Sequence, residues 1–131
     1  QFRIVNGENV ARTGVIRYTL TPQGIMDKGF PLFFDDKRFD ALFRLGVGDL
    51  DGDGRVDMVA GRRDGGLEVY LQTASGEYYR EQSEELESRG RPYDIQLVDL
   101  DGDGRDDLIV AFAEEEGNRG GISVWLSRGQ V

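Results

Sequence analysis

The sequence predicts an all-β protein made of repeated four-stranded antiparallel meanders. Three observations support this fold class. A stretch of acidic and apolar residues recurs with an offset of 50 residues. The flanking segments alternate between apolar and polar residues with the period of two that is typical of strands. The chain of 131 residues also contains 19 Gly against 3 Pro, with 38% hydrophobic residues, which indicates a folded domain with many tight turns.

The repeat is clearest in two acidic segments. Residues 48–57 have the sequence GDLDGDGRVD, and residues 98–107 have the sequence VDLDGDGRDD. Apolar positions around them match in pairs: Phe43 with Tyr93, Leu45 with Ile95, Val47 with Leu97, Met58 with Leu108, Val59 with Ile109 and Ala60 with Val110. Since both the acidic segments and their apolar surroundings recur, the repeated unit is structural.

The strands of the complete unit follow in order along the chain. Alternation predicts a first strand over 43–48, and the apolar run after the acidic segment predicts a returning strand over 56–61. A third strand is expected at 67–71 after two glycines, and a fourth at 78–82. The acidic segment therefore lies at the tip of the hairpin between the first two strands.

The two ends of the chain carry parts of the same unit. Before the complete unit, the pattern predicts second, third and fourth strands at 2–7, 16–20 and 30–34. After it, the third strand recurs at 122–126. The chain thus starts just after the place of one acidic loop and ends just after a third strand.

Units of about 50 residues with four short strands are typical of β-propeller blades, which pack face to face because one meander cannot bury both its faces. We expect a single propeller segment of about two and a half blades. It comprises a partial blade at 1–38, a complete blade at 39–90 and a partial blade at 91–131. A closed ring needs about 4 to 8 blades, so self-association or the remaining blades of a longer chain would complete it.

Composition excludes several classes of function. The sequence has no Cys and no His, which removes disulfide scaffolds, thiolate metal sites and histidine-based nucleophilic catalysis. A net charge of -9 disfavours nucleic acid and anionic membranes as partners. No apolar run approaches the roughly 20 residues of a membrane span.

Each acidic segment forms a nine-residue loop with aspartates at positions one, three, five and nine. Glycines at positions four and six let the backbone curl tightly. Four carboxylates in so short a loop would repel one another without a cation, and Ca²⁺ takes 6 to 8 oxygen ligands, to which the peptide carbonyl at position seven can contribute. We therefore predict two Ca²⁺ per chain. The expected ligands are Asp49, Asp51, Asp53, the Arg55 carbonyl and Asp57 in the first loop, and Asp99, Asp101, Asp103, the Arg105 carbonyl and Asp107 in the second.

Other interpretations of these residues are weaker. A helix-loop-helix calcium site needs an acid at position twelve, where this chain has Ala60 and Val110. Carboxylate pairs could serve a glycosidase, but the calcium loops already contain every convincing cluster, so we expect no enzyme activity. Trp125 could stack on a sugar ring, although packing against a neighbouring blade is favoured. The extra acid Asp106 is assigned either to the surroundings of the ion or to solvent.

The pattern DLDGDGR-x-D followed by MVAG or LIVA resembles the FG-GAP and VCBS-type repeat, the family that includes the blades of integrin α-subunit propellers. The resemblance covers residues 39–126. It implies an extracellular, secreted, periplasmic or cell-surface module that acts in adhesion or in binding a protein or carbohydrate ligand, with Ca²⁺ rigidifying the hairpin loops. Some polysaccharide lyases carry similar propellers, so a lectin or a non-catalytic part of a carbohydrate-active enzyme remains the alternative.

Overall fold

The computed structural model of the chain describes residues 2–6, 13–17, 22–24, 30–35, 42–62, 65–87, 90–113 and 120–127. All regular structure in these ranges is β-strand, which confirms the predicted fold class. Over the described residues, no helix is long and apolar enough to cross a membrane. The chain divides into two compact units, Gln1–Leu42 and Phe43–Val131, which are described separately.

The first unit contains one antiparallel sheet in the order β1-β2-β3. Its strands are β1 (Phe2–Asn6), β2 (Thr13–Arg17) and β3 (Phe30–Asp35). The predictions for β1 and β3 are confirmed to within a residue, but β2 begins three residues before the predicted range of 16–20. The register explains the difference, because β1 pairs from Phe2 with Arg17 to Asn6 with Thr13 and so fixes the extent of its partner. Residues 18–20 lie outside the described part of the chain.

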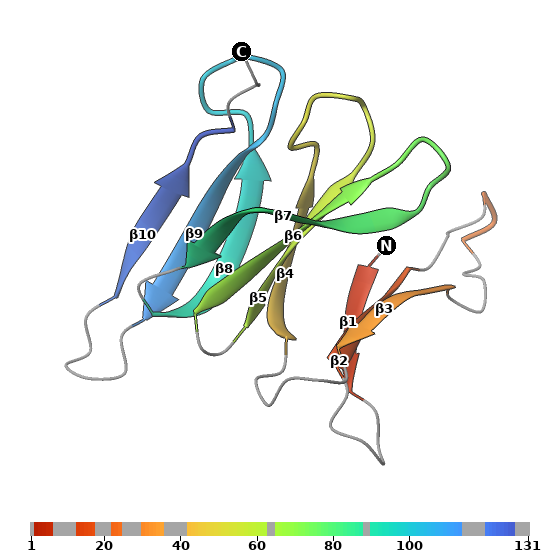
Figure 1. Ribbon diagram of the computed structural model, residues 1–131, viewed down its shortest axis with the longest axis horizontal. Helices are drawn as coiled ribbons and strands as arrows, with labels where there is room; N and C mark the ends of the chain where they lie inside the picture. Colours follow the sequence, from red (N-terminus) through yellow and green to blue (C-terminus); the bar gives the residue numbers. More distant parts are fainter. Residues whose placement is uncertain are drawn as a thin grey trace. The chain divides into compact units, whose positions relative to one another are not determined.

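The second unit begins with a complete four-stranded meander, in the order β4-β5-β6-β7 (Figure 1). Its strands are β4 (Leu42–Gly48), β5 (Asp57–Arg62), β6 (Gly66–Gln72) and β7 (Tyr78–Glu87). This is the four-stranded blade that the sequence predicts for residues 43–82, with β7 extending further than expected. The predicted boundary between residues 38 and 39 falls outside the described ranges.

The last three strands form a second antiparallel sheet in this unit, in the order β10-β9-β8. They are β8 (Arg91–Val98), β9 (Asp107–Ala113) and β10 (Gly120–Trp125). The acidic loops connect β4 to β5 and β8 to β9, as the repeat predicts. The sheet therefore has the first three strands of a blade, and with the β4–β7 sheet it forms an unclosed pair consistent with an incomplete propeller.

The two sheets of the second unit pack face to face around one apolar core. That core combines residues from β5, β6, β8 and β9: Val59, Leu67, Ile95, Leu108 and Val110. Trp125 is partly buried and packs against this cluster, which agrees with the interpretation that its ring serves packing.

Glycines let the two sheets of this unit approach closely. A Cβ atom on Gly46 of β4 would lie 2.5 Å from Ile95 Cγ2, and one on Gly61 of β5 would lie 2.8 Å from Pro92 Cγ. Real side chains do not tolerate such distances. The glycine face of β4 and β5 is thus a flat surface that accepts the side chains of β8.

The opposite face of the β8–β10 sheet is apolar and exposed. We call it the outer face, and it includes Ile122, Val124 and Leu126, which are 69%, 52% and 40% exposed. In β10 and β9, Val124 pairs with Ile109. These two residues correspond in the repeat to Val69 and Val59, a pair that is packed within the core. The outer face is therefore the equivalent of a face that the structure shows covered by the next sheet.

Candidate metal centre

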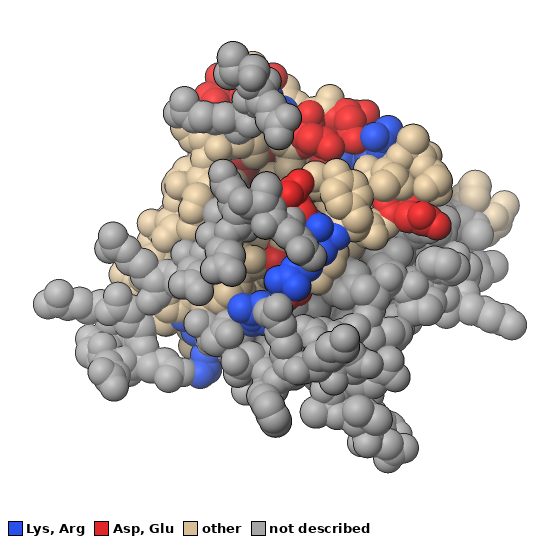
Figure 2. Space-filling view, in the orientation of Figure 1, with Lys and Arg blue, Asp and Glu red and all other residues tan. Residues whose placement is uncertain are grey.

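The two acidic loops lie at the same end of the second unit, at the top of the view in Figure 1. Acidic side chains gather at this end in the space-filling view (Figure 2). The loops lie together because each one follows the first strand of its sheet, and the two sheets pack with equivalent strands pointing the same way.

Both loops curl at the glycines that the sequence singles out. Gly52 and Gly54 have φ angles of 76° and 82°, and Gly102 and Gly104 have 77° and 86°. This left-handed region is strained for residues with a Cβ. Four glycines at positions four and six therefore allow a turn that other residues would oppose.

The loop backbone wraps around the aspartate at position one. Asp49 Oδ1 accepts a hydrogen bond from Gly52 N at 2.9 Å, and Asp49 Oδ2 accepts one from Gly54 N at 2.8 Å. Asp99 accepts the equivalent bonds from Gly102 N and Gly104 N at 2.8 and 2.9 Å. The pKa of Asp99 is lowered, and the hydrogen bond from Gly104 N is the largest cause.

The aspartate at position nine anchors each loop to its sheet. Asp57 is completely buried and accepts bonds from Leu50 N at 2.8 Å and from Gln72 N, at the end of β6, at 2.9 Å. Desolvation raises the pKa of Asp57 even though these two N–H groups act in the opposite direction. In the second loop, the buried Asp107 accepts from Leu100 N and Ser127 N, both at 2.8 Å.

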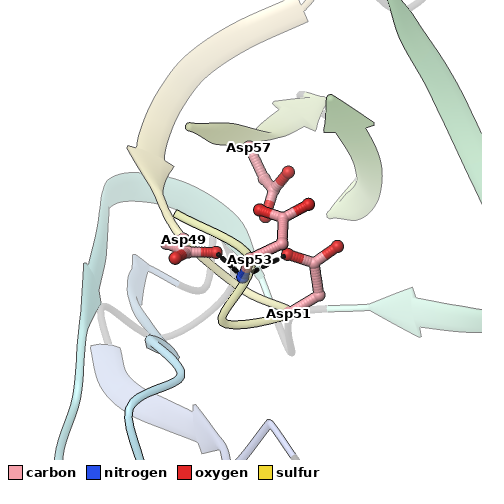
Figure 3. Close-up of side chains that lie close together, drawn as sticks. All are labelled: Asp49, Asp51, Asp53 and Asp57. Atoms are coloured by element: carbon pink, nitrogen blue, oxygen red, sulfur yellow. Dashed lines mark hydrogen bonds between the residues drawn. The ribbon is translucent and has the colours of Figure 1, made fainter. Parts of the chain in front are cut away.

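The first loop brings all four predicted carboxylates together. Ligand oxygens of Asp49, Asp51, Asp53 and Asp57 all lie within 4.8 Å of one another (Figure 3). Desolvation raises the pKa of Asp51 to about 6, with further contributions from its hydrogen bond to the Asp53 side chain and from the charge of Asp57. In contrast, the N–H of Arg55 lowers the pKa of Asp53. Four carboxylates this close together repel one another, and a bound cation would relieve this repulsion.

The second loop brings together three of its four aspartates. Oxygens of Asp99, Asp101 and Asp107 lie within 4.8 Å of one another, and desolvation is the largest cause that raises the pKa of Asp101. The Asp103 carboxylate is not in that group. Its Oδ2 accepts bonds from Arg105 Nη2 at 2.8 Å and from Arg105 Nε at 3.1 Å. The N–H of Arg105 and this ion pair lower the pKa of Asp103.

The arginines at position seven explain part of this difference between the loops. Arg55 Nε donates to the Gln72 carbonyl at 3.1 Å, and only its Nη2 reaches Asp53, at 2.6 Å. Arg105 instead directs both nitrogens to Asp103. In both loops the residue at position seven also donates its N–H to the aspartate at position five, at 2.8 and 2.9 Å. The role of the Arg55 and Arg105 carbonyls as ligands stays a prediction.

One residue at this end has a structural role that sequence reasoning missed. Asp106 Oδ2 accepts a hydrogen bond from Asp49 N at 2.8 Å, and Asp106 N donates to the Asp49 carbonyl at 2.7 Å. Asp106 therefore joins the second loop to the first. The available signal was its place at position eight, where the first loop has Val56.

The donors at this end suit a hard cation. They are carboxylate oxygens, and the sequence contains no His or Cys that would favour a softer metal. The first loop fits Ca²⁺ with four carboxylates, and the second offers three in the same arrangement. Chemically, such loops can hold an ion and fix the hairpin tips.

Fold and loops together define a protein built from blade-like β repeats with acidic hairpin tips. Residues 49–110 match the model of the FG-GAP-like repeat family, a segment that contains both loops. This segment is therefore an FG-GAP-like repeat, as the resemblance in its sequence indicates. No curated protein significantly matches the chain.

Proposed function

We propose that this chain is a calcium-binding β-propeller module. The observation that carries the proposal is that oxygens of the four carboxylates of the first loop lie within 4.8 Å of one another. This loop lies within the segment that matches the FG-GAP-like repeat. The second loop repeats the arrangement with three carboxylates. Two Ca²⁺ per chain is the expected stoichiometry.

The ion would have a structural role in each loop. In the first, Asp49, Asp51, Asp53 and Asp57 would hold it, with the Arg55 carbonyl as a further oxygen. A bound Ca²⁺ neutralises mutual repulsion among the carboxylates and stabilises the native state, because the unfolded chain has no assembled site. The protein's own residues set the loop shape in advance, through the N–H donors around Asp49 and the buried anchor Asp57.

We further propose a role in extracellular adhesion or ligand binding, which the FG-GAP-like match and the predicted Ca²⁺ loops support. Extracellular modules bind Ca²⁺ with dissociation constants of about 10⁻⁴ to 10⁻³ M, which suits a compartment where the ion is abundant. We therefore place the protein outside the cell or on its surface, as a non-enzymatic module. Trp125 was the residue that favoured a carbohydrate ligand, and its packing against the core weakens that alternative.

The outer face supports a further blade as the neighbour of the β8–β10 sheet. Its repeat equivalent on β4–β7 is covered by a sheet of the same type, with Ile95, Leu108 and Val110 in contact. For this chain alone in solution, that neighbour would be a second copy. Sedimentation velocity should then show concentration-dependent association that Val124→Lys abolishes, and a monomer at all concentrations would contradict self-association.

Calorimetric titration of chelator-stripped protein with Ca²⁺ tests the proposed metal binding. The wild type should bind two ions, and Asp51→Asn and Asp101→Asn should each lose one. These two aspartates are exposed, so their replacement leaves the buried anchors intact. Asp94→Asn, an exposed acid on β8 outside the loops, is the matched control and should keep both sites. Absence of binding at millimolar Ca²⁺ would refute the proposal.

A further inference from the structure

The two acidic loops are hydrogen-bonded to each other through Asp106. We propose that this connection makes the two cation sites positively cooperative, so that occupancy of either loop raises the affinity of the other, with Asp106 as the positioning residue. The inference rests on the proposed function, since it concerns the ions that the loops would hold.

The connection between the loops is a reciprocal pair of hydrogen bonds. Asp49 N donates to the Asp106 carboxylate at 2.8 Å, while Asp106 N donates to the Asp49 carbonyl at 2.7 Å. Both the main chain and the side chain of Asp106 therefore take part. A bond to an ionised carboxylate is stronger than one between neutral groups.

Close packing surrounds these hydrogen bonds. A Cβ atom on Gly48 would lie 2.6 Å from Asp106 Oδ2, so the absence of a side chain there gives the carboxylate its space. A Cβ atom on Gly52 would lie 3.0 Å from Arg105 Cγ. The loops thus touch at two places, and displacement of one loop must displace the other.

The bonded residues are those that the ions would hold in place. Asp49 occupies position one of its loop, and the backbone amides of that loop converge on its carboxylate. Asp106 lies between Arg105 and Asp107, which occupy positions seven and nine of the second loop. An ion that fixes Arg105 and Asp107 would also fix the peptide of Asp106, and through it the main chain of Asp49.

Cooperativity follows from the cost of ordering a loop. The first ion to bind reduces the freedom of both loops, so the second ion meets a loop that is already partly ordered. Thermodynamic linkage requires the effect to be equal in both directions. Two bound cations repel each other, and the negative charge of Asp106 at the junction of the loops offsets this repulsion.

Two substitutions separate the hydrogen bond from the charge. Asp106→Val gives the second loop the residue that the first loop has at position eight, and it removes the acceptor. Asp106→Asn keeps an acceptor oxygen but removes the charge. Val56→Asp is the matched control, because it adds a carboxylate at position eight of the first loop, where the side chain is 42% exposed.

The coupling factor is measured by calcium calorimetry. For the wild type and for each variant at position 106 or 56, three proteins are titrated: the parent, the parent with Asp51→Asn and the parent with Asp101→Asn. The coupling factor is the overall binding constant for two ions divided by the product of the constants for the isolated sites, which Asp51→Asn and Asp101→Asn provide. With Asp106 present, we expect a factor of about 5 or more, within the range typical of coupled sites. Asp106→Val should reduce the factor to about 1. Val56→Asp should change the individual affinities and leave the factor unchanged.

Amide hydrogen exchange provides a measurement without any ion. In chelator, the Asp49 amide should exchange faster in Asp106→Val than in the wild type, while Asp106→Asn should largely retain its protection. If Asp106→Val fails to fold, Asp106→Asn still tests the contribution of charge, and its coupling factor should fall between 1 and the wild-type value.

The outcomes distinguish this inference from the proposed function. Two independent sites in the wild type would overturn the coupling and leave calcium binding intact. A factor of 5 or more in Asp106→Val, or unchanged exchange at Asp49, would show that Asp106 is not the connection. Absence of any calcium binding would remove the proposed function, and the coupling with it.

Discussion

Individual aspartates in these loops have different tasks, although the repeat makes them look alike. Asp57 and Asp107 are buried and hold backbone N–H groups from two separate elements. Asp51 and Asp101 are exposed, and the pKa of each is raised. The former contribute to the fold with or without an ion, whereas the latter are the proposed ligands, and the ion-free fold holds their charged forms at a cost.

Asp57→Ala should destabilise the protein even in chelator. The substitution leaves the N–H groups of Leu50 and Gln72 without their acceptor, and bonds to a charged group contribute about 1.5 to 3 kcal/mol each. We expect the free energy of unfolding to fall by about 3 kcal/mol in urea denaturation. Asp51→Ala is the control and should have little effect in chelator; an equal loss in both variants would contradict this division of tasks.

The pH dependence of the ion-free protein should report Asp51. Its pKa of about 6 in the folded state exceeds its ordinary value of 3.8, so the folded state binds more protons than the unfolded state between these values. This group therefore makes the ion-free protein more stable as pH falls from about 6 toward 4. Thermal unfolding in chelator should show a rise in the melting temperature over this window, which Asp51→Asn should diminish.

Calcium affinity should change in the opposite sense over the same window. The ion needs the ionised carboxylate, so protonation of Asp51 competes with binding, and the apparent affinity should fall as the pH drops below about 6. Titrations near pH 6 in buffers of different ionisation enthalpy should detect proton release on binding. No proton release at this pH would contradict the raised pKa of Asp51.

The sequence predicted the carboxylates of each loop because the pattern that they form lies within nine consecutive residues. It could not reveal the bond between Asp49 and Asp106, since these residues lie 57 positions apart and meet only through the packing of two sheets. It also missed the pairing of Asp103 with Arg105. The first loop has the same residue types, and the difference depends on whether Gln72 or the aspartate accepts from the arginine Nε.

At the level of strands and sheets, the alternating pattern predicted which segments form paired strands. It did not predict how closely the β4–β7 sheet approaches the β8–β10 sheet. The alternating pattern does not distinguish the glycines of β4 from other small strand residues, yet Gly46 lies under Ile95 and Leu97 of β8. Arg44 Nε reinforces the same junction by donating to the Tyr93 carbonyl at 2.7 Å. The position of β2 was predicted too late in the chain because its extent depends on the pairing with β1.

Gly46→Ala should loosen the junction between these sheets. The new Cβ would lie 2.5 Å from Ile95 Cγ2 and 3.0 Å from the Ile95 carbonyl oxygen, and the latter cannot rotate away. Overpacking of this kind costs about 1 to 3 kcal/mol, which denaturant unfolding would measure. Gln96→Ala changes the equivalent, exposed position of β8 and should be nearly neutral; equal effects would argue against the close approach.

For the whole molecule, the acidic loops dominate the charge. Nine of the 25 acidic residues, Asp106 included, lie in the two loops, and the remaining 16 equal the number of Lys and Arg. Among the described residues, the acidic side chains of the loops gather at one end of the second unit (Figure 2).

Salt should stabilise the ion-free protein more than the calcium-loaded protein. Raising NaCl from about 0.01 to 0.15 M shortens the screening length from about 30 to 8 Å, which weakens repulsion among the loop carboxylates. Bound Ca²⁺ would already have neutralised most of this repulsion. Melting temperatures measured across this range, with chelator or with saturating Ca²⁺, should rise with salt mainly in chelator; parallel slopes would contradict the assignment.

The contrast between Asp106 and Val56 has a genetic consequence. A duplication that copied one repeat would carry the loop, its anchor and its packing face into the new unit together. The side-chain bond between neighbouring loops would follow only where the copied repeat has aspartate at position eight, as the second loop has and the first has not. Valine and aspartate codons can differ by a single base, so one point mutation in a duplicated repeat is enough to create or remove the carboxylate that accepts this bond.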